Sequence, residues 1–136
     1  MGYTSAMIVE PVASVAEWLE ADLSEGQRRA QHAARQRLYP EQGTTYLEVL
    51  QAIDDTGSVC GVLVYQLPPG DDPYLVFVER AESKRGHRVG DALFEMLRTV
   101  VRDRPIEALA VGEEGAPAMK RWGFVESGGF WKYHGQ

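Results

Sequence analysis

The sequence has few of the features that mark secreted, metal-binding or membrane proteins. Its 136 residues include a single cysteine, Cys60, which excludes an internal disulfide and a cysteine-rich zinc site. No apolar run approaches the roughly 20 residues that cross a bilayer, and the start, MGYTSAMIVEP, lacks the basic and long apolar regions of a secretory signal. The histidines, His32, His87 and His134, have no metal-ligand spacing. We therefore expect a cytoplasmic protein that contacts no membrane and holds no metal.

Positively charged side chains are fewer than negatively charged ones, 14 against 20. The formal net charge of −6 argues against a general affinity for nucleic acid. Two basic segments, 25–37 (EGQRRAQHAARQR) and 84–88 (KRGHR), are the exception, and they are the basis for a nucleic-acid-binding alternative. The length suits one domain, so we expect an extension over 1–6 and a single domain over 7–136.

Apolar periodicity predicts a mixed α/β fold. Strands are expected at 7–12, 44–54, 58–67, 74–78, 106–111, 124–127 and 130–134, and helices after Ser14, Ser24 and Arg85 and over 116–122. The clearest helix carries a stripe of Val89, Leu93, Met96, Leu97, Val100 and Val101, and it ends before Pro105. The order indicates antiparallel strands, then one right-handed parallel crossover, then a final strand, with helices on both faces.

The segment RGHRVG, residues 85–90, opens that helix. Glycines at 86 and 90 let the backbone approach an anion closely, and a helix start offers free N–H groups. Lys84, Arg85 and Arg88 add positive charge. The glycine spacing fits neither a Walker loop nor a Rossmann fingerprint. The segment therefore either seats a diphosphate or only makes a tight turn.

The order of these parts resembles the GCN5-related N-acetyltransferase (GNAT) family from about Met7 to Tyr133. MIVEPVASVAEWLEADL resembles the first strand and helix, and QAIDDTGSVCGVLVYQL the central hairpin. YLVFVERAESKRGHRVGDALFEML resembles the fourth strand, pyrophosphate loop and third helix, and GAPAMKRWGFVESGGFWKYH the final helix and Gly-Phe strand. The resemblance implies a single-domain, mostly antiparallel GNAT-like sheet, and transfer of an acetyl or other acyl group from acyl-CoA to an amine.

The same resemblance implies which residues bind acetyl-CoA, the co-substrate. The family's loop pattern, Gln/Arg-x-x-Gly-x-Gly/Ala, is matched by Arg85 and Gly90, whereas Arg88 stands at the middle glycine. The implied phosphate-binding residues are Arg85, Gly86, His87, Arg88, Val89, Gly90 and Asp91, and the implied pantetheine-binding residues are Phe77, Val78 and Glu79. Arg88 either adds a cation there or crowds the loop.

Two acids are candidate bases for removing a proton from the attacking amine. Many family members place an acid at the start of the fourth strand, which corresponds to Asp72, beside Asp71. Glu79, at the far end of that strand, is the second candidate. The simpler interpretation of Asp71 and Asp72 is that they solvate the turn after Pro68-Pro69-Gly70.

The last helix departs from the family pattern. The position of the family's tyrosine acid is Met119, and the asparagine and alanine positions fall on Gly112 and Gly115. Tyr133, Tyr65 and Ser127 are candidate replacements, and Met119 is expected to pack. A thiolate with a pKa of about 8.5 leaves without an acid, so loss of the tyrosine weakens transfer rather than forbids it.

Two further surfaces each allow two interpretations. Arg28, His32 and Arg35 share one helical face, which either recognises an acidic substrate or is an ordinary exposed face. Trp131 and Tyr133 share one side of the last strand, where they are expected to wall an acceptor cleft or a homodimer contact. The expected partner is a small-molecule or protein amine. The alternative to an enzyme is a GNAT-like domain that binds acyl-CoA or a protein without turnover.

Overall fold

The computed structural model describes residues 7–36, 46–80, 88–109 and 115–135. The strands are β1 (Ile8–Pro11), β2 (Leu47–Ile53), β3 (Val59–Gln66), β4 (Tyr74–Arg80), β5 (Ile106–Leu109), β6 (Phe124–Ser127) and β7 (Phe130–Tyr133). The helices are α1 (Val15–Glu20), α2 (Glu25–Arg35), α3 (Val89–Val100) and α4 (Ala116–Arg121). Every expected element is therefore present, within a few residues of its expected place.

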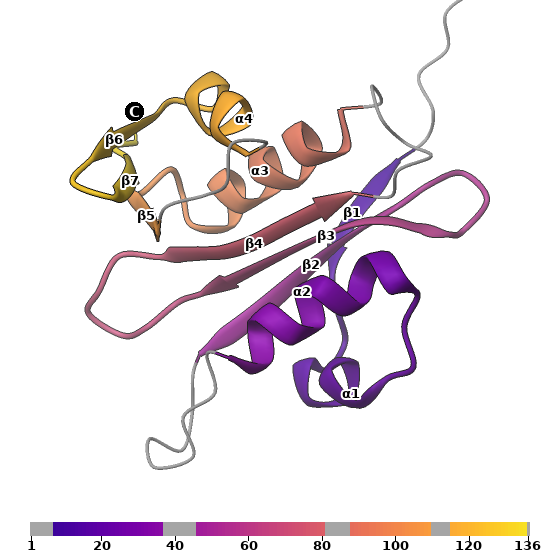
Figure 1. Cartoon of the computed structure of the whole chain (residues 1–136). Helices are drawn as coiled ribbons and strands as arrows, with labels where there is room; N and C mark the ends of the chain where they lie inside the picture. Colours follow the sequence, from indigo (N-terminus) through magenta and orange to yellow (C-terminus); the bar gives the residue numbers. More distant parts are fainter. Residues whose placement is uncertain (1–6, 37–45, 81–87, 110–114, 136) are drawn as a thin grey trace, which may run out of the picture.

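The strands form one sheet in the order β1-β2-β3-β4-β5-β7-β6. Among the strands of the described residues, only β4 and β5 pair in parallel, and α3 makes the crossover between them. Helices α1 and α2 cover one face of the sheet, and α3 and α4 cover the other (Figure 1). This arrangement confirms the mixed, mostly antiparallel sheet with helices on both faces.

Local sequence explains where the elements begin and turn. The Ser14 hydroxyl accepts a hydrogen bond from the backbone N–H of Glu17 and caps α1, as predicted. Between β2 and β3, the Asp54 carboxylate accepts the N–H groups of Thr56 and Ser58. Gly57 has a φ of 86°, which is strained for any other residue in that turn.

Two separate cores lie on the two faces of the sheet. The core under α3 and α4 buries large side chains, including Leu63, Leu93, Leu97, Ile106 and Phe124. The core under α1 and α2 is built around Trp18, Leu47, Val49, Val62 and Val64. In α3 the expected stripe needs one correction, because Phe94 is buried while Val100 is exposed at the end of the helix.

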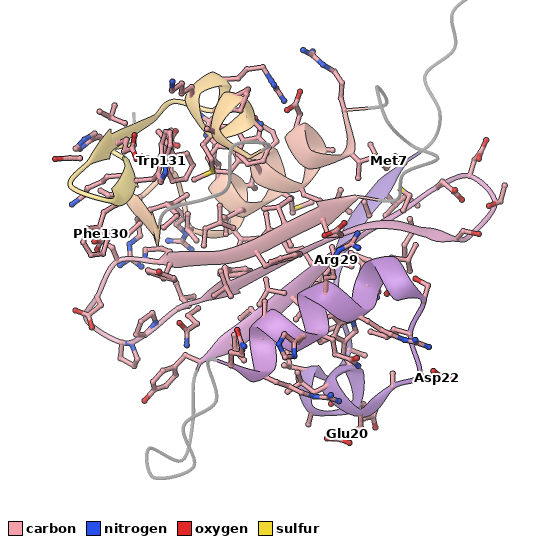
Figure 2. The ribbon with its side chains drawn as sticks, in the orientation of Figure 1. Met7, Glu20, Asp22, Arg29, Phe130 and Trp131 are labelled. Atoms are coloured by element: carbon pink, nitrogen blue, oxygen red, sulfur yellow. The ribbon has the colours of Figure 1, made fainter. Side chains whose placement is uncertain are left out.

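The aromatic residues of the last strand also need a correction. Trp131 and Tyr133 are 3% and 5% exposed and belong to the core under α3 and α4. They are therefore core residues, and the expectation that they wall a cleft or a dimer contact is wrong. Phe130, the neighbour that points to the other face of the sheet, is the exposed aromatic of β7 (Figure 2).

Candidate acyl-CoA site

Among the described residues, β4 continues beyond the point where β5 pairs with it. Their register holds only Tyr74 opposite Glu107 and Leu75 opposite Ala108. Beyond Leu75, β4 runs on to Arg80 while its other edge stays paired with β3. On the edge of β4 that faces β5, the backbone N–H and C=O groups beyond Leu75 therefore have no pairing partner among the described residues of β5. A linear ligand with amide groups can hydrogen-bond to such an edge.

A β-bulge lies at the point where the strands separate. Val64 pairs with Phe77 and Tyr65 with Leu75, so Val76 is an extra residue in β4. The bulge turns the side chains of Val76 and Phe77 both toward the α1/α2 core, while Val78 packs against the opposite core. Because a bulge bends and twists its strand, it accounts for the divergence of β4 from β5.

The far end of β4 is held from both faces. Glu79 accepts two hydrogen bonds from Arg29 of α2, from Nη2 at 2.5 Å and from Nε at 3.2 Å. On the other face, Gly61 of β3 lets α3 approach, because a Cβ there would lie 2.4 Å from a Val89 methyl and 3.1 Å from the Glu79 carbonyl oxygen. The glycine at 61 therefore brings the start of α3 against the free end of β4.

The start of α3 is the second half of the candidate site. Its N-cap is Arg88, which has φ 58° and ψ 35° and makes no side-chain cap hydrogen bond. This left-handed conformation explains why glycine is usual at this position. The Arg88 side chain, which is 75% exposed, pairs with Asp91 through Nε at 3.2 Å. Arg85, Gly86 and His87 lie outside the described residues.

Gly90 and Asp91 join α3 to α4. A Cβ on Gly90 would lie 3.3 Å from the Trp122 ring, so glycine permits this close packing. One oxygen of Asp91 accepts hydrogen bonds from Arg121 at 2.6 Å and from Trp122 Nε1 at 2.7 Å. Burial alone raises the pKa of Asp91, but those two hydrogen bonds and the charges of Arg121 and Arg88 lower it below its usual value. Asp91 is thus an ionised anchor inside the candidate site.

The structure shows the surroundings of Met119, which stands at the family's tyrosine acid, and of the three residues considered as replacements. Met119 is buried in the core, as expected for a packing residue. The Tyr133 hydroxyl donates a 2.5 Å hydrogen bond to Asp103, beyond the C-terminal end of α3. Burial, followed by the charge of Glu48, raises the pKa of Tyr65 to about 12, which makes it a poor proton donor. Ser127 is exposed at the end of β6.

The two candidate bases lie near opposite ends of β4. Asp72 precedes the strand, its carboxylate lies 3.9 Å from the Lys132 ammonium of β7, and its side chain is 34% exposed. Glu79 is more buried, and both of its oxygens accept hydrogen bonds from Arg29. The geometry thus leaves Asp72 more accessible to a substrate proton than Glu79.

The basic face of α2 is occupied by local contacts. Arg28 donates to the Leu23 carbonyl, Arg35 to the Leu19 carbonyl, and His32 contacts Gln36. These contacts favour the interpretation of an ordinary exposed helical face. Among the described residues, no cluster of metal-ligating side chains occurs, and no helix is long and apolar enough to span a membrane.

Comparison with solved structures shows the GNAT fold. A protein from Corynebacterium glutamicum, named as histone acetyltransferase HPA2 and related acetyltransferase, is 18% identical, with 96% of this chain and 97% of that chain covered and a TM-score of 0.63. AtaTR bound with AcCoA is 14% identical, covers 93% and 92%, and has a TM-score of 0.65. An IAA acetyltransferase from Bacillus cereus is 16% identical, covers 93% and 97%, and has a TM-score of 0.58. No family model and no curated protein matches the sequence.

Several site contacts could not be found from the sequence. The Arg29–Glu79 pair joins residues 50 positions apart, and the Asp91–Trp122 bond joins residues 31 apart. Neither has a local spacing that would predict it. Gly61 is different, because a glycine inside an apolar strand signals close approach of another element, and the resemblance also included it.

Proposed function

We propose that this chain is an acyl-CoA-dependent N-acyltransferase. The observation that carries the proposal is the edge of β4 that no described residue of β5 pairs. It begins at a bulge and ends beside the start of α3, where Arg88 makes no side-chain cap hydrogen bond. Pantetheine contains two amide groups, which fit an unpaired strand edge at Phe77, Val78 and Glu79. A diphosphate fits the N–H groups of Val89, Gly90 and Asp91, together with Arg85, Gly86, His87 and Arg88. GNAT-fold neighbours include a protein solved with acetyl-CoA, which supports this assignment.

The chain's own contribution to the reaction is positioning and removal of one proton. The neutral amine nitrogen attacks the thioester carbonyl and forms the new N–C bond, and the C–S bond breaks with its electron pair on sulfur. The nitrogen, positively charged after the attack, loses its second proton to solvent. Asp72 is the proposed base for the ammonium proton, since its carboxylate is partly exposed and only weakly paired with Lys132. Glu79 is the second candidate, which would require Arg29 to release it. The thiolate takes its proton from solvent, because Met119 offers none.

Binding and turnover test this proposal separately. With a Kd near 10 µM, a hundredfold excess of acetyl-CoA should stabilise the protein by about 2.7 kcal/mol and raise Tm by several degrees. ATP at the same concentration is the control for a general phosphate effect, and Gly86→Glu should abolish the shift. Release of free thiol is then measured with a panel of amines, and Asp72→Asn should lower kcat about a hundredfold. No Tm shift with acetyl-CoA contradicts the proposal.

A second candidate function is acyl-CoA or protein binding without turnover. It is favoured by Met119, which is buried where the family's acid stands, and by Arg88, which holds a strained conformation where glycine is usual. A Tm shift with acetyl-CoA but no thiol release above the hydrolysis background would support it. The GNAT-fold neighbour KacTA was solved in a complex with DNA. With a net charge of −6, we propose no DNA contact for this chain itself.

A further inference from the structure

Helix α2 has unusually little apolar material with which to hold its place. Its sequence, EGQRRAQHAAR, contains no apolar side chain larger than alanine. Over residues 27–35, where burial is described, the buried ones are Ala30, Gln31 and Ala34. Alanine buries a single methyl group, whereas a leucine side chain buries several carbon atoms and stabilises correspondingly more. Polar contacts therefore carry a large share of the docking of α2.

Those polar contacts run in two directions. Toward α1, Gln31 Nε2 donates to the carbonyls of Trp18, Leu19 and Ala21 at 2.8–3.1 Å. Toward the sheet, Arg29 makes its two hydrogen bonds to Glu79 (Figure 2 shows Arg29 reaching from α2 toward the strands). The first set joins the helices to each other, and the second joins α2 to β4.

The position of Glu79 gives the second contact a particular consequence. Glu79 lies three residues after the bulge at Val76, in the part of β4 that has lost its β5 neighbour. A strand paired on one edge only frays and twists more easily than one paired on both. The side chain of Glu79 is 18% exposed and that of Arg29 is 61% exposed, so the pair is shielded from the sheet side and open to solvent on the helix side.

We propose that Arg29 is a positioning residue that acts through Glu79. The bidentate pair holds the free end of β4 at a fixed place against α2, so that the backbone of Phe77–Glu79 is ordered before acyl-CoA arrives. Ordering a binding edge in advance increases affinity because the ligand no longer bears that entropic cost. This inference rests on the proposed function, and it gives Glu79 an anchoring role instead of the role of a base.

The experiment compares two neighbouring arginines of α2. Arg29→Gln removes the tie to β4. Arg28→Gln is the matched control, because Arg28 is also 61% exposed but pairs at 3.5 Å with Asp22, whose side chain is 97% exposed. Glu79→Gln removes the other partner, and the double exchange Arg29→Glu with Glu79→Arg restores an ion pair of reversed direction. Each protein is measured for amide hydrogen exchange in β4 without ligand, and for acetyl-CoA affinity by calorimetry.

The expected result is a linked change in both measurements. Arg29→Gln and Glu79→Gln should speed exchange of the β4 amides after Val76 by about tenfold and weaken acetyl-CoA binding by about five- to tenfold. Arg28→Gln should match the wild type in both, and the double exchange should recover part of the affinity. Acetyl-CoA turnover by Glu79→Gln should show a raised KM for acetyl-CoA, with the pH profile of kcat unchanged.

Three results would overturn the inference. One is unchanged β4 exchange in Arg29→Gln, and another is a lower Tm with unchanged acetyl-CoA affinity, which indicates plain packing. The third is a fall in kcat with a displaced pH profile in Glu79→Gln, which makes Glu79 the base. If the wild-type titration itself shows no acetyl-CoA binding, the proposed function fails and the positioning role fails with it. That outcome is recognised before any variant is compared.

Discussion

The two helical layers of this sheet are held in different ways. On one face, α3 packs through Val89, Leu93, Phe94 and Leu97, and Phe94 stacks on Trp122 with ring centroids 4.9 Å apart. On the other face, α2 packs through alanines and directed hydrogen bonds. The apolar layer is held mainly by buried side chains, so its largest single contributions come from apolar residues such as Leu93. The polar layer depends on a few named contacts, so it can be shifted by changing a single side chain.

The largest expected effect comes from cutting into the apolar layer. Leu93 is fully buried in the middle of α3. Leu93→Ala removes its burial and leaves a cavity, which should cost about 3 kcal/mol. Chemical denaturation should therefore show a clearly lower midpoint with an unchanged m-value. Val100→Ala, at an exposed position of the same helix, is the control. Equal effects of the two changes would contradict an apolar layer centred on Leu93.

The next effect comes from the polar layer. Gln31→Ala removes the amide that donates to the carbonyls of Trp18, Leu19 and Ala21. The Leu19 carbonyl keeps its bond from Arg35 and the Trp18 carbonyl its bond from the Ala21 N–H, so we expect a loss of about 1.5 kcal/mol. Gln36→Ala removes an exposed amide that contacts only His32 in the described contacts, and it should change the free energy of unfolding by less than about 0.5 kcal/mol. If Gln31→Ala changes the free energy of unfolding no more than Gln36→Ala does, α2 needs no polar anchor at Gln31.

A smaller effect with a pH signature is expected at Asp91. The folded protein holds the pKa of Asp91 below its usual value, so the unfolded chain takes up its proton first as pH falls. The stabilisation is therefore present at neutral pH and is lost as pH falls below about 4. Asp91→Asn should cost about 1 kcal/mol at pH 7 and progressively less as pH falls below about 4. Tm measured across that range checks this, and a difference that is constant with pH would contradict the ionised anchor.

The smallest expected effect is at Arg88. Its left-handed backbone conformation favours glycine, whereas the lost pairing with Asp91 involves an exposed side chain. Arg88→Gly should therefore leave stability unchanged or raise it by about 0.5 kcal/mol. Arg88→Val, which is β-branched and cannot relieve the strain, should lower it. If both variants lower Tm equally, the Arg88 side chain matters more than its backbone conformation.

The sequence predicted the elements and their order better than it predicted the site. Apolar periodicity located α3, and the turn residues of DDTG located the β2–β3 hairpin, because both signals are local. The bulge at Val76 has no such signal, since it depends on the register between β3 and β4. Trp131 and Tyr133 share one side of β7, as predicted, but their burial depends on the core that forms between that face of the sheet and the helices α3 and α4. Asp72 and Glu79 looked equivalent as acids, and only their contacts with Lys132 and Arg29 separate them.

The most direct test of the central claim is amide NMR of the labelled protein during titration with acetyl-CoA. Binding along the open edge of β4 predicts that the largest shifts fall in Phe77–Glu79 and Val89–Asp91. The exposed face around Val125 and Phe130 should remain unchanged. The absence of shifts in β4 and α3 at millimolar acetyl-CoA, or shifts confined to β6 and β7, would contradict an acyl-CoA site at the divergence of β4 and β5.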